Sequence, residues 1–161
     1  MNDVASVLSM GVTGGLIALA AALLVATVLG VAKRRRAGQF RAASPATRAK
    51  TAGALTEADL GAGLGRQATL VQFSTAFCAP CRPTRQILAQ VADMVDGVTH
   101  VEIDAAARMD LVQRLRINST PTVLVLDPDG AIVKRATGLP RKADVIAALG
   151  PVVRAEDRSR K

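Results

Sequence analysis

Apolar and polar residues follow one another along residues 56–150 in the pattern of a small α/β unit. Short apolar runs with β-branched residues predict strands, and apolar residues three or four positions apart predict helices. Thr56 and Asp59 suit the N-cap and first turn of a helix, and Asp127 to Gly130 suit a hairpin turn. The expected elements are a short helix from Thr56 towards Leu64, a strand over 68–75, a helix over 78–95, a strand over 98–105, a helix over 107–116, strands over 122–127 and 131–138, and a helix that begins near Pro140.

Alternating strands and helices that end in a hairpin predict an α/β fold with a mixed central sheet flanked by helices. About 100 residues suffice for such a domain. The helical spacing also predicts which side chains are buried. They are Ile87, Leu88, Val91 and Val95 in one helix, Met109, Leu111, Val112 and Leu115 in the next, and Val145, Ile146 and Leu149 in the last.

The first 32 residues differ from the rest of the 161-residue chain. No charged residue occurs from Val4 to Ala32, and Leu, Val and Ala dominate from Met10 onwards. About 20 apolar residues cross the hydrocarbon core of a bilayer as a helix, so we interpret residues 1–32 as a transmembrane anchor. A cleaved signal peptide is the alternative, but its basic residues would precede a shorter apolar core, and here they follow it.

Basic residues are concentrated outside the predicted domain. Residues 33–50 hold seven Lys or Arg and no acid, whereas residues 51–153 hold ten bases and ten acids. The net charge of +8 therefore does not indicate nucleic-acid binding, and a chain without Trp or Tyr offers few rings on which bases could stack. We expect the basic segment to lie against anionic lipid headgroups instead.

The same basic cluster predicts the orientation of the chain. Lys and Arg beside a membrane segment tend to stay in the cytoplasm, so the remainder of the chain is expected to face the cytoplasm. We interpret residues 33–55 as a flexible basic linker, 56–153 as the folded domain and 154–161 as a charged tail.

The two cysteines, Cys78 and Cys81, lie in the stretch FCAPCRP, where the first predicted strand passes into a helix. We expect both on the first turns of that helix, on one face and close enough for a disulfide. The helix N-terminus, with Arg82 and Arg85, would favour a thiolate at Cys78. A zinc ion shared between two chains and a pair of small buried thiols are the alternatives, although structural zinc takes four ligands and the only histidine is His100.

From about Thr56 to Gly150 the chain resembles the thioredoxins. The stretches that carry the resemblance are TLVQFSTAFCAPCR, VEID, RINSTPTVLVLDPDG and TGLP, in this order and spacing. The resemblance implies a thioredoxin fold, with Cys78 as the attacking thiol and Cys81 as the resolving thiol. It also implies that Pro121 is a cis-proline beside the sulfurs, preceded by Thr120, which would offer backbone hydrogen bonds to a bound polypeptide.

Some residues depart from the family pattern. Phe77 stands where thioredoxins usually have Trp, and Ala79 where they usually have Gly. Gln72 replaces the buried acid that assists proton movement at the resolving cysteine, and an amide cannot accept a proton. His100, on the adjoining strand, is a candidate replacement. The expected substrate-binding residues are Phe77, Ala79, Pro80, Thr120 and Pro121.

The expected function is dithiol–disulfide exchange that reduces disulfides in substrate proteins. A cytoplasmic position favours the reducing direction. No nucleotide or flavin motif occurs, so electrons are expected from a reductase protein, with no metal or cofactor beyond the Cys78–Cys81 disulfide. The alternatives are an extracytoplasmic reductase of the kind that serves cytochrome maturation, and a non-catalytic binding module with the same fold.

Overall fold

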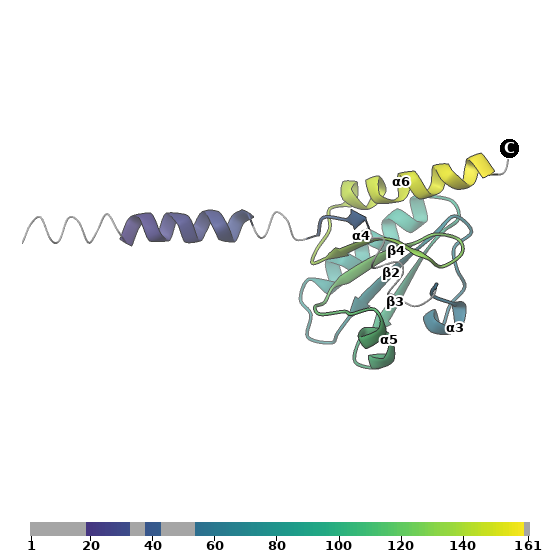
Figure 1. Ribbon diagram of the computed structural model, residues 1–161, viewed down its shortest axis with the longest axis horizontal. Helices are drawn as coiled ribbons and strands as arrows, with labels where there is room; N and C mark the ends of the chain where they lie inside the picture. The colour runs from purple at the N-terminus through teal and green to yellow at the C-terminus, as the bar shows by residue number, and fades with distance from the viewer. Residues whose placement is uncertain (1–18, 33–37, 43–53, 160–161) are drawn as a thin grey trace, which may run out of the picture. The chain divides into compact units, whose positions relative to one another are not determined.

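The computed structural model describes residues 19–32, 38–42 and 54–159. The chain divides into two compact units, Met1–Arg36 and Ala37–Lys161. In the first unit, residues 19–32 form a helix, and in the second the chain forms an α/β domain (Figure 1). The elements of the second unit are β1 (Arg41–Ala42), α3 (Glu57–Leu60), β2 (Ala68–Ser74), α4 (Cys81–Met94), β3 (Val98–Asp104), α5 (Met109–Arg114), β4 (Thr122–Leu126), β5 (Ile132–Thr137) and α6 (Lys142–Ser159).

Five strands form one mixed sheet in the order β1-β5-β4-β2-β3. β3 runs parallel to β2, and the other neighbouring strands pair antiparallel. Every residue of β2 is buried, because β2 lies between two strands and has helices on both of its faces (Figure 1). The α/β fold with a mixed sheet and flanking helices, predicted from the sequence, is therefore confirmed.

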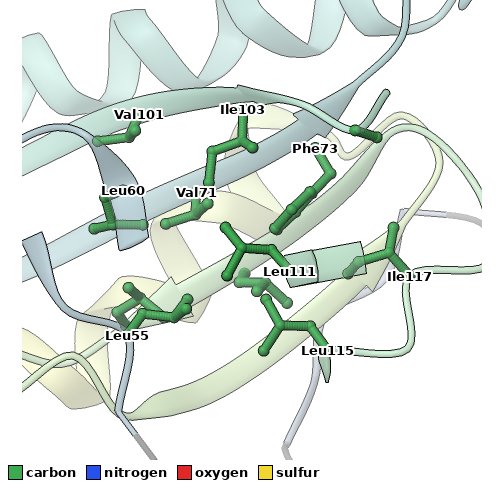
Figure 2. Close-up of a cluster of buried hydrophobic side chains, with 12 residues drawn as sticks. Leu55, Leu60, Val71, Phe73, Val101, Ile103, Leu111, Leu115 and Ile117 are labelled. Atoms are coloured by element: carbon green, nitrogen blue, oxygen red, sulfur yellow. The ribbon is translucent and has the colours of Figure 1, made fainter. Parts of the chain in front are cut away.

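Two hydrophobic clusters pack on opposite faces of the sheet. Alternate residues of β2 divide between them, since successive side chains of a strand point to opposite faces. Val71 and Phe73 join the cluster that contains residues of α3 and α5, called here the α3/α5 cluster (Figure 2). Ala68 and Leu70 join the cluster that contains residues of α4 and α6, called here the α4/α6 cluster.

Each helix and strand predicted between residues 56 and 150 is present, but two predicted core residues are wrong. Met109 is 51% exposed, because α5 begins at this residue and its buried side is formed by Leu111 with Leu115 one turn later. Ile146 is 41% exposed, because α6 buries Val145 and residues at helical spacing from it, and Ile146 points about 100° away.

Part of the segment interpreted as a flexible linker belongs to the sheet. β1 pairs with β5, with Arg41 opposite Arg135, and Phe40 packs against the α4/α6 cluster. Gly38 has φ +83°, and an added Cβ would lie 2.1 Å from the carbonyl oxygen of Leu139, so only glycine fits here. The expectation of a flexible linker over 33–55 is therefore wrong for residues 38–42, which hydrogen bonding to β5 holds in place.

The described helix over residues 19–32 consists of apolar and small residues apart from Thr27. Among the residues that the structure describes, no helix reaches both the length and the apolar character needed to cross a bilayer. Residues 1–18 of the predicted anchor lie outside the described residues.

Candidate active site

The two cysteines lie at the junction between β2 and α4. Cys78 belongs to the turn after β2, and α4 begins at Cys81 with Pro80 as its N-cap. The amide of Cys78 donates to the carbonyl of Thr75 (3.2 Å), and that of Cys81 donates to the carbonyl of Cys78 (3.0 Å). The expectation that both cysteines lie on the helix is thus wrong for Cys78, which belongs to the turn that precedes the N-cap residue Pro80.

A disulfide joins Cys78 and Cys81, with an S–S distance of 2.01 Å and 5.3 Å between the Cα atoms. The two cysteines differ in exposure: Cys81 is 3% exposed, whereas Cys78 is half-buried. The neighbouring residues Ala79 and Pro80 are exposed, and the side chain of Phe77 projects fully into solvent (100%). An incoming thiol or disulfide can therefore reach Cys78 more easily than Cys81.

The proline loop is connected to the cysteine turn. The Thr120–Pro121 peptide bond is cis, which confirms the isomer implied by the family resemblance. The hydroxyl oxygens of Thr75 and Thr120 lie 3.2 Å apart, so a hydrogen bond joins the two loops. Pro121 is buried and its carbonyl accepts from the amide of Gly138 (2.8 Å), while Thr120 is half-buried.

Gln72 lies beneath the start of α4. Its side chain is fully buried, and Nε2 donates to the carbonyl oxygen of Cys81 (3.0 Å). Its Oε1 is buried and has no hydrogen-bond partner among the described residues. The amide thus supports the backbone at the buried cysteine, but it cannot accept a proton from the Cys81 thiol.

A cluster of charged residues beside the cysteines was not predicted from the sequence. Arg85 binds Glu102 through two nitrogens, with Nε 2.5 Å from Oε2 and the terminal nitrogen 2.7 Å from Oε1. The hydroxyl of Ser74 donates to the same Oε1 (2.6 Å). Burial disfavours the charged form of Glu102, but the hydrogen bonds from Arg85 and Ser74 outweigh it and hold the pKa of this carboxyl below its ordinary value.

This cluster lines a cavity of about 490 Å³ that both cysteines also line. Glu102 comes to this place because β3 runs parallel to β2 and pairs it with Gln72. Arg85 lies one helical turn after Cys81, on the same side of α4. The sequence indicates Arg85 as a positive charge near Cys78, but its partner Glu102 follows only from the register of β2 and β3, whose paired residues are 30 positions apart.

His100 lies on β3 two residues before Glu102, and residues that line the cavity do not include it. Burial lowers the pKa of its imidazole, although the carboxylate of Glu102 acts in the opposite direction. Its Nε2 is buried without a hydrogen-bond partner among the described residues. His100 therefore stays a candidate for the role of the missing acid, with no contact to either cysteine in this structure to support it.

In the described part of the chain, no three His, Cys, Asp or Glu side chains gather around one point. The cysteines bind each other instead. A disulfide in the turn after the central strand, with a hydrogen bond from this turn to the loop of a cis-proline, is the arrangement expected of a thiol–disulfide oxidoreductase.

Comparisons with known proteins give the family. The family model for thioredoxin matches residues 54–150. The thioredoxin of Mycobacterium tuberculosis is 31% identical over 85 residues, 52% of this chain and 72% of that protein. The thioredoxin of Alicyclobacillus acidocaldarius is 31% identical over 101 residues, 62% of this chain and 95% of that protein. The chain belongs to the thioredoxin family.

Solved structures agree on the fold. A mutant thioredoxin from Halobacterium salinarum superposes with a TM-score of 0.50 at 19% identity, covering 55% of this chain and 76% of that one.

Family membership together with the cysteine pair gives the chain thiol–disulfide oxidoreductase activity. The family also implies protein substrates that contain disulfides and a reductase partner, and thioredoxins use no cofactor beyond the active-site dithiol.

Proposed function

We propose that this protein is a membrane-anchored reductase of protein disulfides, in which Cys78 attacks the substrate and Cys81 releases it. The observation that carries the proposal is the difference in burial of the two cysteines. Cys78 is half-buried in an exposed turn, whereas Cys81 is 3% exposed. A substrate disulfide can therefore meet Cys78 first, and Cys81 stays close enough to displace the substrate afterwards, with its Cα 5.3 Å from that of Cys78.

The exchange takes place in two steps. The thiolate of Cys78 attacks one sulfur of the substrate disulfide, which forms a mixed disulfide and releases the other substrate sulfur as a thiolate. Cys81 then loses its proton and attacks the sulfur of Cys78, which releases the second substrate thiolate. The substrate has gained two electrons, and the Cys78–Cys81 disulfide must be reduced by an electron-donor protein before the next cycle.

The residues around the cysteines form the proposed surface for the substrate polypeptide. Phe77, Ala79 and Pro80 are exposed beside Cys78 and offer mainly apolar contact. Thr120 and Pro121 belong to the loop that a hydrogen bond joins to the cysteine turn. In this proposal the fully exposed ring of Phe77 packs against the substrate, which removes apolar surface from water.

The membrane anchor is proposed on the character of the N-terminal residues. Val4 to Ala32 carry no charge, and the large apolar side chains of the described helix are 46% to 66% exposed in the chain alone. The hydroxyl of Thr27 donates to the carbonyl of Leu23 (2.7 Å), so the one polar side chain of the described helix needs no water. Both features are compatible with a helix whose side chains contact the lipid bilayer.

The basic residues after the helix support contact with anionic lipid and a cytoplasmic position of the domain. The proposed organisation is an anchor over 1–32, a basic linker over 33–55 that contributes residues 41–42 to the sheet, a thioredoxin-like domain over 56–153 and a charged tail over 154–161. In the cytoplasm the dithiol form would prevail, which sets the reducing direction.

The catalytic proposal is tested with insulin as the disulfide substrate. We expect Cys78→Ser to lose reduction of insulin completely and Cys81→Ser to accumulate a mixed disulfide that is visible on a non-reducing gel. The exposed Ser119→Ala serves as a control that leaves both sulfurs in place. Insulin reduction at the native rate by Cys78→Ser would refute the proposal. If cells that carry a variant without both cysteines behave like cells with the native protein, a non-catalytic binding module would be favoured.

The anchor and its orientation need a separate measurement. We expect the full chain to stay in the membrane fraction after alkaline carbonate extraction, whereas a chain that begins at Ala37 is released. A phosphatase reporter fused after Lys161 should be inactive if this end lies in the cytoplasm. An active reporter would favour the extracytoplasmic reductase. Release of the full chain by carbonate would refute the proposal that residues 1–32 anchor the protein in the membrane.

A further inference from the structure

The cavity beside the cysteines holds four charged groups. Arg85 and Glu102 form the ion pair described above, and Arg82 and Asp104 complete the lining. The carboxylate of Asp104 accepts from the backbone amide of Ala106 (2.9 Å). With two positive and two negative groups, the cavity is electrically balanced while the disulfide is present.

Reduction changes this balance. The disulfide is neutral, but in the proposed exchange the reduced form attacks as a thiolate of Cys78, whose charge would arise at the wall that the four charged groups share. A group that stabilises the thiolate stabilises the reduced protein, which makes the pair easier to reduce. A group that repels the thiolate has the opposite effect.

We propose that Arg85 and Glu102 act in opposite directions on the reduction potential of the Cys78–Cys81 disulfide, with Arg85 favouring the reduced form and Glu102 limiting this effect. The inference rests on the proposed function. Glu102 also fixes the position of Arg85, because the two nitrogens of the guanidinium bind both oxygens of one carboxylate. The side chain of Glu102 is only 24% exposed, so water screens its charge less than at an open surface.

Two contacts connect the pair with the elements that carry the cysteines. Ser74, the last residue of β2, donates to Glu102 (2.6 Å), so the carboxylate is held from the strand that leads into the Cys78 turn. Arg85 is attached to the same helix as Cys81, one turn later. Through its contacts with Ser74 and Arg85, Glu102 therefore connects β2, which precedes the cysteine turn, with α4, which follows it.

The remaining titratable group near Glu102 is His100. Burial lowers the pKa of the imidazole, so His100 is neutral around pH 7 and adds no charge to the balance there. Neutral replacement of one partner of the ion pair therefore leaves the cavity with one unbalanced charge of known sign.

The test measures the equilibrium of the full chain with glutathione. Two glutathione molecules supply two electrons and two protons to the disulfide and leave as glutathione disulfide. We expect Arg85→Gln to lower the equilibrium constant for reduction at least threefold and Glu102→Gln to raise it at least threefold, about 15 mV in opposite directions. The double variant should return close to the native value.

Matched controls separate this effect from a general loss of charge. Arg114→Gln and Asp59→Asn remove the same charges from an ion pair of α5 and α3 (2.8 Å), on the other face of the sheet. We expect both controls to leave the equilibrium constant unchanged. Shifts of both cavity variants in one direction, or shifts no larger than those of the controls, would overturn the inference.

The alkylation rate of Cys78 is a second readout of the thiolate, independent of the equilibrium with glutathione. The rate of Cys78 alkylation in the reduced protein should fall in Arg85→Gln and rise in Glu102→Gln at pH 7, because the thiolate fraction changes. Equal rates in both variants would count against the inference. The glutathione equilibrium needs neither a protein substrate nor a membrane, so its outcome is independent of whether insulin reduction and anchoring are found.

Discussion

The two faces of the central sheet are built from the same strands but serve different purposes. On β2, Val71 and Phe73 face the α3/α5 cluster, which contains only apolar side chains. On the other face, apolar residues of β2 give way to Gln72 and Ser74 as the strand approaches Cys78. Near the cysteines, therefore, the face of Val71 and Phe73 stays apolar, whereas the other face exchanges packing for hydrogen bonds.

The adjoining strand repeats this division. Val101 and Ile103 belong to the α3/α5 cluster, whereas Glu102, between them in sequence, binds Arg85 and Ser74 on the opposite face. Since a buried polar group is costly unless it is paired, a polar region is tolerated where hydrogen bonds are available. Apolar packing stabilises both faces, but polar groups beside the cysteines lie on one face only, so we expect variants on the two faces to differ in their effect on the redox equilibrium.

The largest expected effect concerns the apolar face. Phe73 is fully buried in the α3/α5 cluster, and Phe73→Ala should lower the free energy of unfolding by about 3–5 kcal/mol. The protein that remains folded should keep the native equilibrium with glutathione. Chemical denaturation and the glutathione assay measure the two quantities. Phe73→Leu is the milder control, and a changed redox equilibrium in Phe73→Leu would contradict the separation of the two faces.

A charge at the polar end of the opposite face should have the next largest effect. In Gln72→Glu, burial would raise the pKa of the new carboxyl above its value in the unfolded chain. The variant should match the native stability at pH 4 and lose about 2 kcal/mol at pH 7, because the unfolded state releases the proton more readily. Denaturation at both pH values measures this. Equal stability at pH 7 would mean that the site can accommodate an anion.

The capping box of α3 tests the edge of the apolar face. The hydroxyl of Thr56 accepts from the amide of Asp59 (3.2 Å), and the carboxylate of Asp59 accepts from the amide of Thr56 (3.0 Å). Thr56→Ala should cost about 1 kcal/mol of stability without a change in redox equilibrium. Thr56→Ser retains the hydroxyl and should restore most of the loss, and failure to do so would assign the effect to the methyl group.

The smallest expected effect is the pH dependence that Glu102 contributes. Its pKa lies below the ordinary value of 4.5, so the folded state binds this proton more weakly than the unfolded state. The stabilisation is therefore complete above the unfolded pKa and is lost as the pH falls through the folded pKa. Glu102→Gln should flatten the acid limb of the stability curve below about pH 4.5. An unchanged acid limb would indicate that Arg85 and Ser74 do not favour the anion.

Local patterns in the chain were sufficient for much of this architecture. Thr56 begins a helix, Asp127 to Gly130 form the turn of the hairpin, and the apolar run from Ala68 forms the central strand, because each depends on neighbours in sequence. The sequence also predicted which residues neighbour Cys78 and Cys81 in the turn, since they belong to the same short motif. Details at element ends, such as Cys78 lying before α4 and Met109 being exposed, were missed.

The sequence by itself determined the order of the elements, the pairing of Cys78 with Cys81 as neighbours, and the apolar character of residues 4–32. Only the tertiary structure decided that residues 41–42 extend the sheet and that Glu102 meets Arg85 in the cavity that the cysteines line. The reason is physical: helix spacing and turn chemistry act over a few residues, whereas these contacts depend on strand register and on how α4 packs over the sheet.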